Sequence, residues 1–438
     1  MDNTPDLPPP NATSDRPRVR YVDATPIEHE GQNLFVLRDA EGVCPNEITV
    51  PPITYYIMAL MDGTRDLAEV ETEVARQTGQ TFEREKLEGL LENLDEAYLL
   101  ANERSAERLR AIEEEFKALE VRPAAHAGEA YPDDPKELVQ TFDGFFTNSK
   151  GPGTPNGVHT RRPLGLVTPH IDLRCGGPCM AWGFDRLRCE SPADLYIILG
   201  VAHNPAPNLY TLTDKDFDSP LGAAMTDRDA AARLRELYGA DRLSGELVHK
   251  REHSVEFQTV FLKYLHREGG DIENDFKILP LLCGSLHEDL ADGKPDPVKR
   301  PDVGEFVAAL RQLIAEYKGK VCIIAGVDLS HVGRKFGHDY GADKLRQDIV
   351  RSADLRMLEH IENRSPEDFF DHFRGDANAR NVDAVAAVYT MLHVLDDGTV
   401  GDSAGEANGK AKAELLNYDQ YIEEPTDSMV SFAAMALY

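Results

Sequence analysis

The sequence predicts an α/β protein in which a mostly parallel central sheet is flanked by helices and preceded by a small winged-helix-like α+β domain. Three observations lead to this prediction. After residue 160, near-continuously apolar runs alternate with helical stretches, which is typical of buried parallel strands. Short amphipathic helices cluster before residue 103, and a stretch rich in Pro and Gly separates the two patterns.

The first 40 residues have the composition of a disordered or extended tail. Pro8, Pro9 and Pro10 interrupt a polar segment that shows no apolar periodicity. Residues 21–50 contain short apolar stretches, such as residues 34–37, and are a candidate for a small hairpin.

Residues 41–102 are predicted to form the winged-helix-like domain. Residues 53–61 are an apolar helix candidate, Leu67, Val70 and Val74 repeat at helical spacing, and Gly79 is placed to end that second helix. A third helix spans residues 87–94 and precedes a strand-like end at residues 98–100. The third helix carries more Glu than Arg and Lys, which argues against contact with phosphates and favours docking of a protein or a purely structural role.

Residues 103–160 are interpreted as a charged helix followed by a linker rich in Pro and Gly. Gly151–Gly157 is the clearest boundary signal. We therefore expect the main α/β domain to occupy residues 161–438.

The net charge excludes some classes of partner. The 438 residues contain 47 Lys and Arg against 77 Asp and Glu, which gives a formal charge of −30. A chain this acidic is repelled by nucleic acid and by anionic lipid. No apolar run reaches the roughly 18–20 residues that a membrane helix needs, and the polar start does not resemble a signal peptide. We expect a cytoplasmic protein that binds neither nucleic acid nor membranes.

The α/β domain contains four apolar runs that are predicted to be strands: residues 164–167, 195–199, 276–282 and 321–325. Helical patterns lie between and around them at residues 179–187, 227–238, 255–266 and 304–317.

Polar residues follow three of the four predicted strands. His170 follows the first, His203 follows the second, and Asp328, Ser330 and His331 follow the last. Ligands of open α/β sheets bind at the carboxyl ends of the strands. A single histidine after a strand is often a capping residue, but three equivalent positions together favour a functional site.

A further polar group lies at the predicted start of the helix over residues 255–266. His253 and Glu256 are three residues apart and could face the same way, while Ser254 could cap the helix. A plain capped helix start is the alternative.

Imidazoles and carboxylates that converge from separate segments suit a divalent metal. We expect His170 and His203 to be metal ligands, and the third ligand stays open among Asp328, His331, Asp172 and Glu256. Two histidines and one carboxylate form the ligand set of non-haem Fe(II) oxygenases, and zinc hydrolases use a related set.

Five motifs in this order resemble the MEMO family. The first is Thr168-Pro169-His170 with the later Cys175–Pro178, which is similar to a "PHAGY…SG" segment of the family. The second, Ile198–His203, is similar to "ILGPSH", and the third, Glu252–Gln258, is similar to "EHSLE-x-Q". The other two are Asp328–His331, similar to "SSD-L-SH", and Ser428–Ala434, similar to the closing "SVSYAA" strand. The resemblance covers about residues 161–438.

The upstream module, about residues 45–101, resembles a PqqD-like winged-helix domain. That fusion is found in some bacterial members called AmmeMemoRadiSam system protein B, which implies radical-SAM and AMMECR1-like protein partners. It does not make this chain a radical-SAM enzyme.

The resemblance implies a fold like that of the class III extradiol dioxygenases and a cleft lined by His170, His203 and position 330. Some family members carry a cysteine where Ser330 stands here, and Asp172 departs from the usual Ala-Gly after the first histidine. The family also includes a signalling adaptor whose site binds peptides.

Three functions follow as hypotheses. The first is a dioxygenase-like redox enzyme with Fe or Cu at His170 and His203, with His253 or His331 as acid or base and Asp328 orienting an imidazole. The second is a non-catalytic adaptor that binds a peptide or small molecule in the same cleft. The third is a hydrolase that uses a water bound to zinc. Glu256 is grouped with the catalytic candidates, and Asp172 and Ser330 with the other cleft residues.

Overall fold

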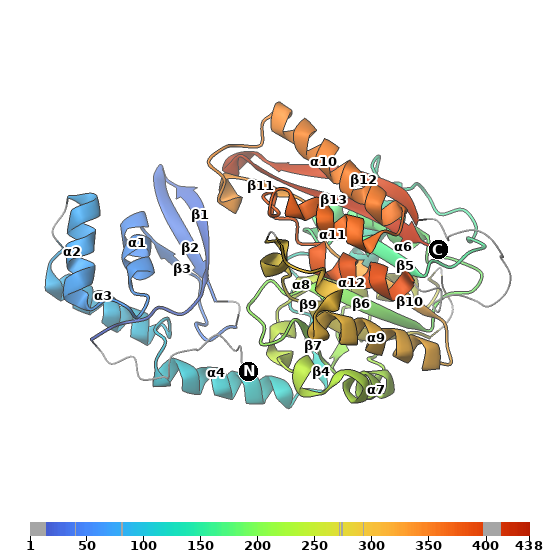
Figure 1. Cartoon of the computed structure of the whole chain (residues 1–438), viewed down its shortest axis with the longest axis horizontal. Helices are drawn as coiled ribbons and strands as arrows, with labels where there is room; N and C mark the ends of the chain where they lie inside the picture. Colours follow the sequence, from blue (N-terminus) through green and yellow to red (C-terminus); the bar gives the residue numbers. More distant parts are fainter. Residues whose placement is uncertain are drawn as a thin grey trace. The chain divides into compact units, whose positions relative to one another are not determined.

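The computed structural model describes residues 15–39, 41–79, 82–270, 272, 275–291, 293–396 and 413–438. The chain divides into two compact units, Met1–Leu119 and Glu120–Tyr438, and each has its own apolar core (Figure 1). The start of the predicted tail, residues 1–14, lies outside the described residues. None of the described helices is long and apolar enough to cross a membrane.

The first unit combines a small antiparallel sheet of order β1-β2-β3 with helices (Figure 1). The bounds are β1 Asp23–His29, β2 Gln32–Arg38, β3 Ile48–Val50, α1 Pro52–Leu60, α2 Leu67–Thr78, α3 Arg84–Glu96 and α4 Glu103–Lys117. β1 and β2 pair along their whole length as a hairpin. The predicted tail is therefore shorter than expected, because Leu37 of this hairpin is buried in the core of the unit.

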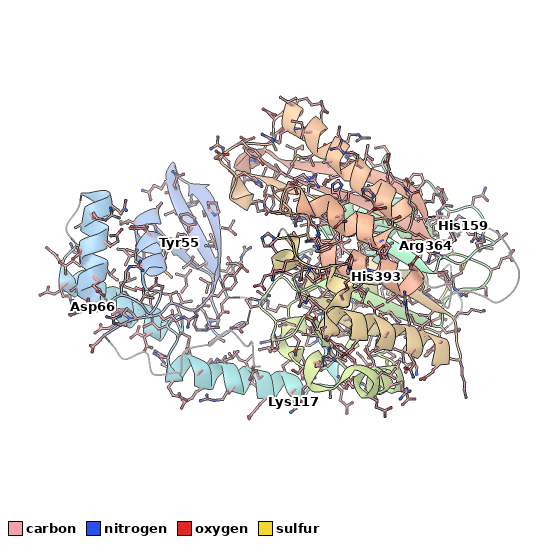
Figure 2. All side chains as sticks on the ribbon, in the orientation of Figure 1. Tyr55, Asp66, Lys117, His159, Arg364 and His393 are labelled. Carbon is pink, nitrogen blue, oxygen red and sulfur yellow. The ribbon has the colours of Figure 1, made fainter. Side chains whose placement is uncertain are left out.

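Local capping explains why α2 has the bounds that the sequence predicts. The side chain of Asp66, labelled in Figure 2, accepts hydrogen bonds from the backbone N–H groups of Ala68 and Glu69, and the Glu69 carboxylate accepts one from the Asp66 N–H. Gly79 ends the helix in the left-handed conformation, with φ of 69°. The three predicted helices after residue 51 are present; the likeness to a winged helix stays a prediction.

The second unit is built on an eight-stranded sheet of order β11-β13-β5-β10-β6-β9-β7, with β12 paired to β13. The four central strands β5, β10, β6 and β9 are parallel, and the outer ones pair antiparallel. The bounds are β5 Gly165–Thr168, β6 Leu195–Val201, β7 Tyr210–Leu212, β9 Lys277–Cys283, β10 Val321–Gly326, β11 His331–Gly333, β12 Ala413–Glu423 and β13 Ser428–Leu437. All four predicted strands are confirmed, together with the mostly parallel sheet.

Helices cover both faces of this sheet, because its central strands are apolar on both sides. Ile197 of β6 and Ile323 of β10 point into one core with α7, α9, α11 and α12, whereas their neighbours Ile198 and Ile324 point into the other with α5, α6 and α8. The bounds are α5 Pro135–Thr147, α6 Leu173–Asp185, α7 Arg228–Tyr238, α8 His253–Leu265, α9 Pro301–Glu316, α10 Lys344–Glu362, α11 Pro366–Arg374 and α12 Val385–Asp396.

The predicted linker is wrong for residues 120–160. This segment contains α5 and the short strand β4 (Val121–Arg122), which pairs with β8 (Asp216–Phe217). Phe142 and Phe146 of α5 are fully buried against Phe261 of α8. The Pro and Gly content at both ends of α5 concealed this aromatic helix, so the second unit begins about 40 residues before the predicted boundary at 161.

Two glycines allow the start of α8 to approach the carboxyl edge of the sheet. A Cβ atom on Gly200 of β6 would lie 2.5 Å from Ser254 Oγ, and one on Gly326 of β10 would lie 2.6 Å from the Ser254 carbonyl oxygen. Both distances are below van der Waals contact. Glycine at these two strand ends therefore places the first turn of α8 directly over the site described next.

Candidate functional site

Three adjacent parallel strands each deliver one polar side chain at the second residue beyond the strand. β5 ends at Thr168 and is followed by His170, β6 ends at Val201 and is followed by His203, and β10 ends at Gly326 and is followed by Asp328. β10 lies between β5 and β6 in the sheet, so the three residues meet at one edge. The structure thus brings together one residue that follows each of these three strands.

The start of α8 adds a third imidazole to this edge. The ring centroid of His253 lies 4.7 Å from that of His203 and 5.0 Å from that of His170, and the His170 and His203 centroids are 4.9 Å apart. One ring nitrogen from each histidine lies within 4.8 Å of the other two. These three residues are called the histidine cluster below.

Each histidine of the cluster has its Nδ1 atom beside a fixed oxygen. His170 Nδ1 lies 2.9 Å from the Gly326 carbonyl oxygen, His203 Nδ1 lies 3.0 Å from Glu252 Oε1, and His253 Nδ1 lies 3.3 Å from the same Glu252 atom. An oxygen acceptor at Nδ1 keeps the proton there and leaves the Nε2 lone pair free. When a ring is neutral, this arrangement leaves its Nε2 atom available to a metal ion.

Glu252 is the acceptor that organises two of the rings. It is the N-cap residue of α8, where its carboxylate accepts a hydrogen bond from the Ser254 N–H at 3.0 Å, and it also accepts one from the His203 N–H at 3.1 Å. Burial works to raise the pKa of Glu252, but the charge and hydrogen bond of His203 outweigh it and hold that pKa well below its usual range. Glu252 is therefore an ionised, buried carboxylate.

Two carboxylates lie on the other side of His170. Asp328 Oδ1 accepts hydrogen bonds from the backbone N–H groups of His170 (3.1 Å) and Ile171 (3.2 Å), and Asp328 Oδ2 lies 3.6 Å from His170 Nε2. Asp383, just before α12, accepts the Asp328 N–H through Oδ1, and its Oδ2 lies 3.2 Å from His170 Nε2. That Asp383 oxygen is buried without a well-aligned hydrogen bond, as expected for an atom that faces a cation.

The charges of these groups explain their pKa shifts. Burial alone lowers the pKa of His170, but the negative charges of Asp328 and Asp383 outweigh burial and raise it to about 10. Burial and the charge of Asp383 raise the pKa of Asp328, whereas the cationic His170 overcomes burial and lowers the pKa of Asp383. Without a metal, His170 is therefore an imidazolium ion between two acids, and a metal ion would replace its Nε2 proton.

The other two histidines differ in charge. Burial lowers the pKa of His253 well below its ordinary value, so its ring is neutral. Burial also works against protonation of His203, but the Glu252 charge prevails and raises its pKa. The His203 side chain is 37% exposed, which leaves one side of the histidine cluster open to solvent.

The donor set fits a divalent metal. Three imidazoles with oxygen acceptors beside Nδ1 are ligands that iron, copper and zinc all accept. His170, Asp328 and Asp383 form a second group of donor atoms within 4.8 Å of one another. The two groups share His170 Nε2, which can bind one ion at a time, so the geometry describes one metal position with carboxylates beside it.

Comparison with known proteins identifies the family. A model of the family described as "Memo-like protein" matches residues 122–436. The chain belongs to this family. A MEMO1 family protein of Aquifex aeolicus is 29% identical over 423 residues, which cover 97% of this chain and 100% of the relative. A MEMO1 family protein of Thermus thermophilus is 29% identical over 377 residues, which cover 86% of this chain and 100% of the relative. One of Pyrococcus furiosus is 28% identical over 325 residues, which cover 72% of this chain and 99% of the relative.

Glu256 lies outside the histidine cluster of this Memo-like chain, contrary to the sequence prediction. Its side chain is fully buried and forms an ion pair with Arg122 Nη1 at 2.6 Å. Although residues three apart lie on the same side of a helix, the Glu256 carboxylate is held by donors from residues 122–131 and does not reach the cluster.

Asp172 and Ser330 also point away from the cluster. Asp172 caps α6 by accepting the Arg174 N–H and pairs with the Arg174 side chain. Ser330 is fully buried and donates its hydroxyl hydrogen to Asp354 Oδ1 at 2.6 Å, within a network that includes Ser431. Neither residue is placed to bind a metal held by the histidine cluster.

His331 lies at the margin of the site. Its Nε2 atom is 3.9 Å from Asp383 Oδ2, and its Nδ1 atom lies 3.1 Å from the carbonyl oxygens of Leu329 and Asn381. At 3.9 Å the His331 ring lies near Asp383 without a hydrogen bond to it, and it does not join the histidine cluster. Its predicted acid–base role stays a prediction.

Sequence reasoning missed two residues of the site. Glu252 was visible next to His253, and its position before a helix was the signal that could have identified it as an N-cap. Asp383 follows no strand and precedes an apolar helix, so no local pattern indicates that it reaches His170. The third imidazole, His253, was predicted as an acid or base, and the geometry places it with the two expected ligands.

Proposed function

We propose that this Memo-like protein holds one divalent metal ion, iron or copper, at His170, His203 and His253, and that it is a dioxygenase-like redox enzyme acting on a small molecule. The observation that carries this proposal is the convergence of three imidazoles whose Nδ1 atoms all face oxygen acceptors. A fortuitous cluster of histidines would not need an oxygen acceptor beside all three Nδ1 atoms.

The carboxylate beside the histidine cluster is the reason for placing iron first, because the three imidazoles alone suit iron, copper and zinc alike. Histidines combined with a carboxylate and open positions are the ligand set of non-haem Fe(II) oxygenases, and Asp383 Oδ2 lies 3.2 Å from His170 Nε2. Bound iron or copper would supply one-electron chemistry and activation of oxygen. A zinc ion in the same histidines would instead support hydrolysis, which is the alternative to test.

The residues of the chain have separate tasks in this proposal. Glu252 fixes the rings of His203 and His253, and Asp328 fixes the backbone of His170 through two N–H groups. Asp383 Oδ2, 3.2 Å from His170 Nε2, balances the charge of His170 and of a bound metal ion. The exposed side of His203 is where a small molecule would enter.

The decisive experiment measures metal content and oxygen consumption together. We expect protein purified without chelators, or reconstituted anaerobically with Fe(II), to hold about one metal ion per chain and to consume oxygen with a cognate reductant or substrate from a screen. The His170→Ala/His203→Ala variant should lose the metal, and a control substitution at the exposed His287 should keep it.

Other results would point to other functions. Zinc at full occupancy with hydrolysis and no oxygen uptake would favour the hydrolase. No metal after reconstitution, together with saturable binding of a peptide or small molecule, would favour an adaptor. Radical-SAM and AMMECR1-like partners and a cytoplasmic location remain predictions from the resemblance, which co-purification and fractionation would test.

A further inference from the structure

The loop that precedes α8 is held by hydrogen bonds to its carbonyl oxygens from a distant part of the chain. Arg122 Nε donates to the His249 carbonyl oxygen at 2.6 Å, and Arg122 Nη2 donates to the Glu252 carbonyl oxygen at 2.9 Å. His126 Nε2 lies 2.9 Å from the Arg251 carbonyl oxygen, which accepts its hydrogen. Three of four consecutive carbonyl groups, at positions 249, 251 and 252, are thus bound by two side chains from residues 122–126.

The segment that supplies these side chains is itself anchored to α8. The buried carboxylate of Glu256 accepts hydrogen bonds from Arg122 Nη1 (2.6 Å), the Ala125 N–H (3.1 Å), the His126 N–H (2.9 Å) and the Tyr131 hydroxyl (2.6 Å). All donors of this carboxylate come from residues 122–131. A charged group buried with this many donors holds a rigid arrangement.

His126 also touches the histidine cluster. Its ring centroid lies 5.8 Å from that of His253 in an edge-on contact and 5.8 Å from that of Phe257. Phe257 in turn lies 5.4 Å from His253. The His253 ring therefore lies between the other two histidines of the cluster on one side and the rings of His126 and Phe257 on the other.

We propose that residues 120–131 act as a clamp and that Arg122 and His126 are positioning residues of the site. The clamp fixes the 249–252 loop, so that Glu252 and His253 are already in place before a ligand arrives. The clamp itself follows from contacts within the chain, and its effect on a metal ion rests on the proposed function. Ligand side chains that are already fixed bind a metal more tightly, because they lose less conformational entropy when the metal binds.

His126 is the residue to substitute, because a change at the buried Arg122 leaves Glu256 without its cation and could unfold the unit. His126→Ala removes the bond to the Arg251 carbonyl oxygen. His126→Gln retains a side-chain N–H that can reach the same oxygen. His287→Ala is the matched control, since it removes an exposed histidine that lies outside the clamp.

The test combines hydrogen exchange of the metal-free protein with Co(II) titration. In His126→Ala, amides of residues 249–254 should exchange about fivefold to tenfold faster, which corresponds to one lost hydrogen bond, while amides of β6 and β10 stay unchanged. Co(II) affinity, followed by visible absorption, should fall about 10–100-fold with an altered spectrum. His126→Gln should recover most of both effects.

The two readouts separate failure of the clamp from failure of the metal centre. Unchanged exchange at residues 249–254 in His126→Ala would overturn the clamp, whatever happens to Co(II). Faster exchange in a protein whose wild type binds no Co(II) would support the clamp and overturn the metal centre. Equal losses in His126→Gln and His126→Ala would show that the bond to Arg251 is not what holds the loop.

Discussion

Two buried carboxylates one helical turn apart, Glu252 and Glu256, have different surroundings on α8. The Glu252 carboxylate faces His203 and His253 and is 2% exposed. The Glu256 carboxylate is fully buried against Arg122 and two backbone N–H groups, with a tyrosine hydroxyl as its fourth donor. The first has imidazole partners that can exchange a proton near neutral pH or bind a metal, and the second has partners that keep their protons there.

This difference separates a functional carboxylate from a structural one. Burial and charge are common to both residues, so neither property alone identifies a site. The chemistry of the partners decides, because a guanidinium and backbone N–H groups are permanent donors, whereas an imidazole changes its state with its ligand. Substitutions at Arg122, Glu252, His249 and Asp172 should separate the two kinds of residue.

Breaking the Arg122–Glu256 pair should cost the most stability. Arg122→Met leaves the Glu256 carboxylate buried without its cation, and we expect the free energy of unfolding to fall by about 3–5 kcal/mol in urea denaturation. Arg122→Met/Glu256→Met should recover much of this loss. Arg174→Met, which removes an exposed pair with Asp172, should change stability by less than about 1 kcal/mol. A stable Arg122→Met single variant would contradict the structural role of Glu256.

Glu252→Gln should act on the metal rather than on the fold. The amide can no longer hold the protons on Nδ1 of His203 and His253 as strongly, so Co(II) affinity should fall about 10–100-fold. Chelator competition measures this affinity, and circular dichroism should show an intact fold. The exposed Glu129→Gln serves as the control. Equal Co(II) affinities in wild type, Glu252→Gln and Glu129→Gln would show that Glu252 does not support the metal site.

The buried His249 should make the protein sensitive to acid. Burial, followed by the charge of Arg122, lowers the pKa of His249 to about 3, whereas the unfolded chain has a pKa near 6.5. Below pH 6.5 the unfolded state therefore binds a proton that the folded state refuses, and stability falls until pH reaches about 3. At pH 5 this contribution amounts to about 2 kcal/mol. His249→Gln should lack it when urea unfolding at pH 7 and pH 5 is compared with wild type.

Asp172→Ala should have the smallest effect. The substitution removes the cap of α6 and the exposed pair with Arg174, which predicts a loss of about 1 kcal/mol in the free energy of unfolding. Co(II) affinity should equal that of wild type. A loss of metal in this variant would return Asp172 to the site and contradict the placement described above.

The sequence predicted the sheet and half of the site for one physical reason. Parallel strands leave their carboxyl ends at one edge, so His170, His203 and Asp328 could be brought together without knowing the strand order. Asp383 could not be found in this way, since its approach to His170 depends on how α12 packs across the sheet. The face of α8 that Glu256 occupies depends on Arg122, more than 130 residues away in the sequence.

The segment before residue 161 was misjudged because composition was weighed above periodicity. Pro and Gly at residues 151–157 suggested a linker, while Phe142, Phe145 and Phe146 in α5 signalled a buried helix. The same segment contains Arg122 and His126, so the prediction of a linker also hid the clamp. In the first unit, α2 begins and ends at the capping residues visible in the sequence, Asp66 and Gly79.

Binding of one metal ion by the Nε2 atoms of His170, His203 and His253 can be observed in crystals of protein reconstituted with Fe(II). Diffraction data would be collected on both sides of the iron absorption edge. We expect one anomalous peak per chain about 2.0–2.2 Å from all three Nε2 atoms. A peak held by Asp328 and Asp383 without His203 and His253, or no peak at full reconstitution, would contradict it.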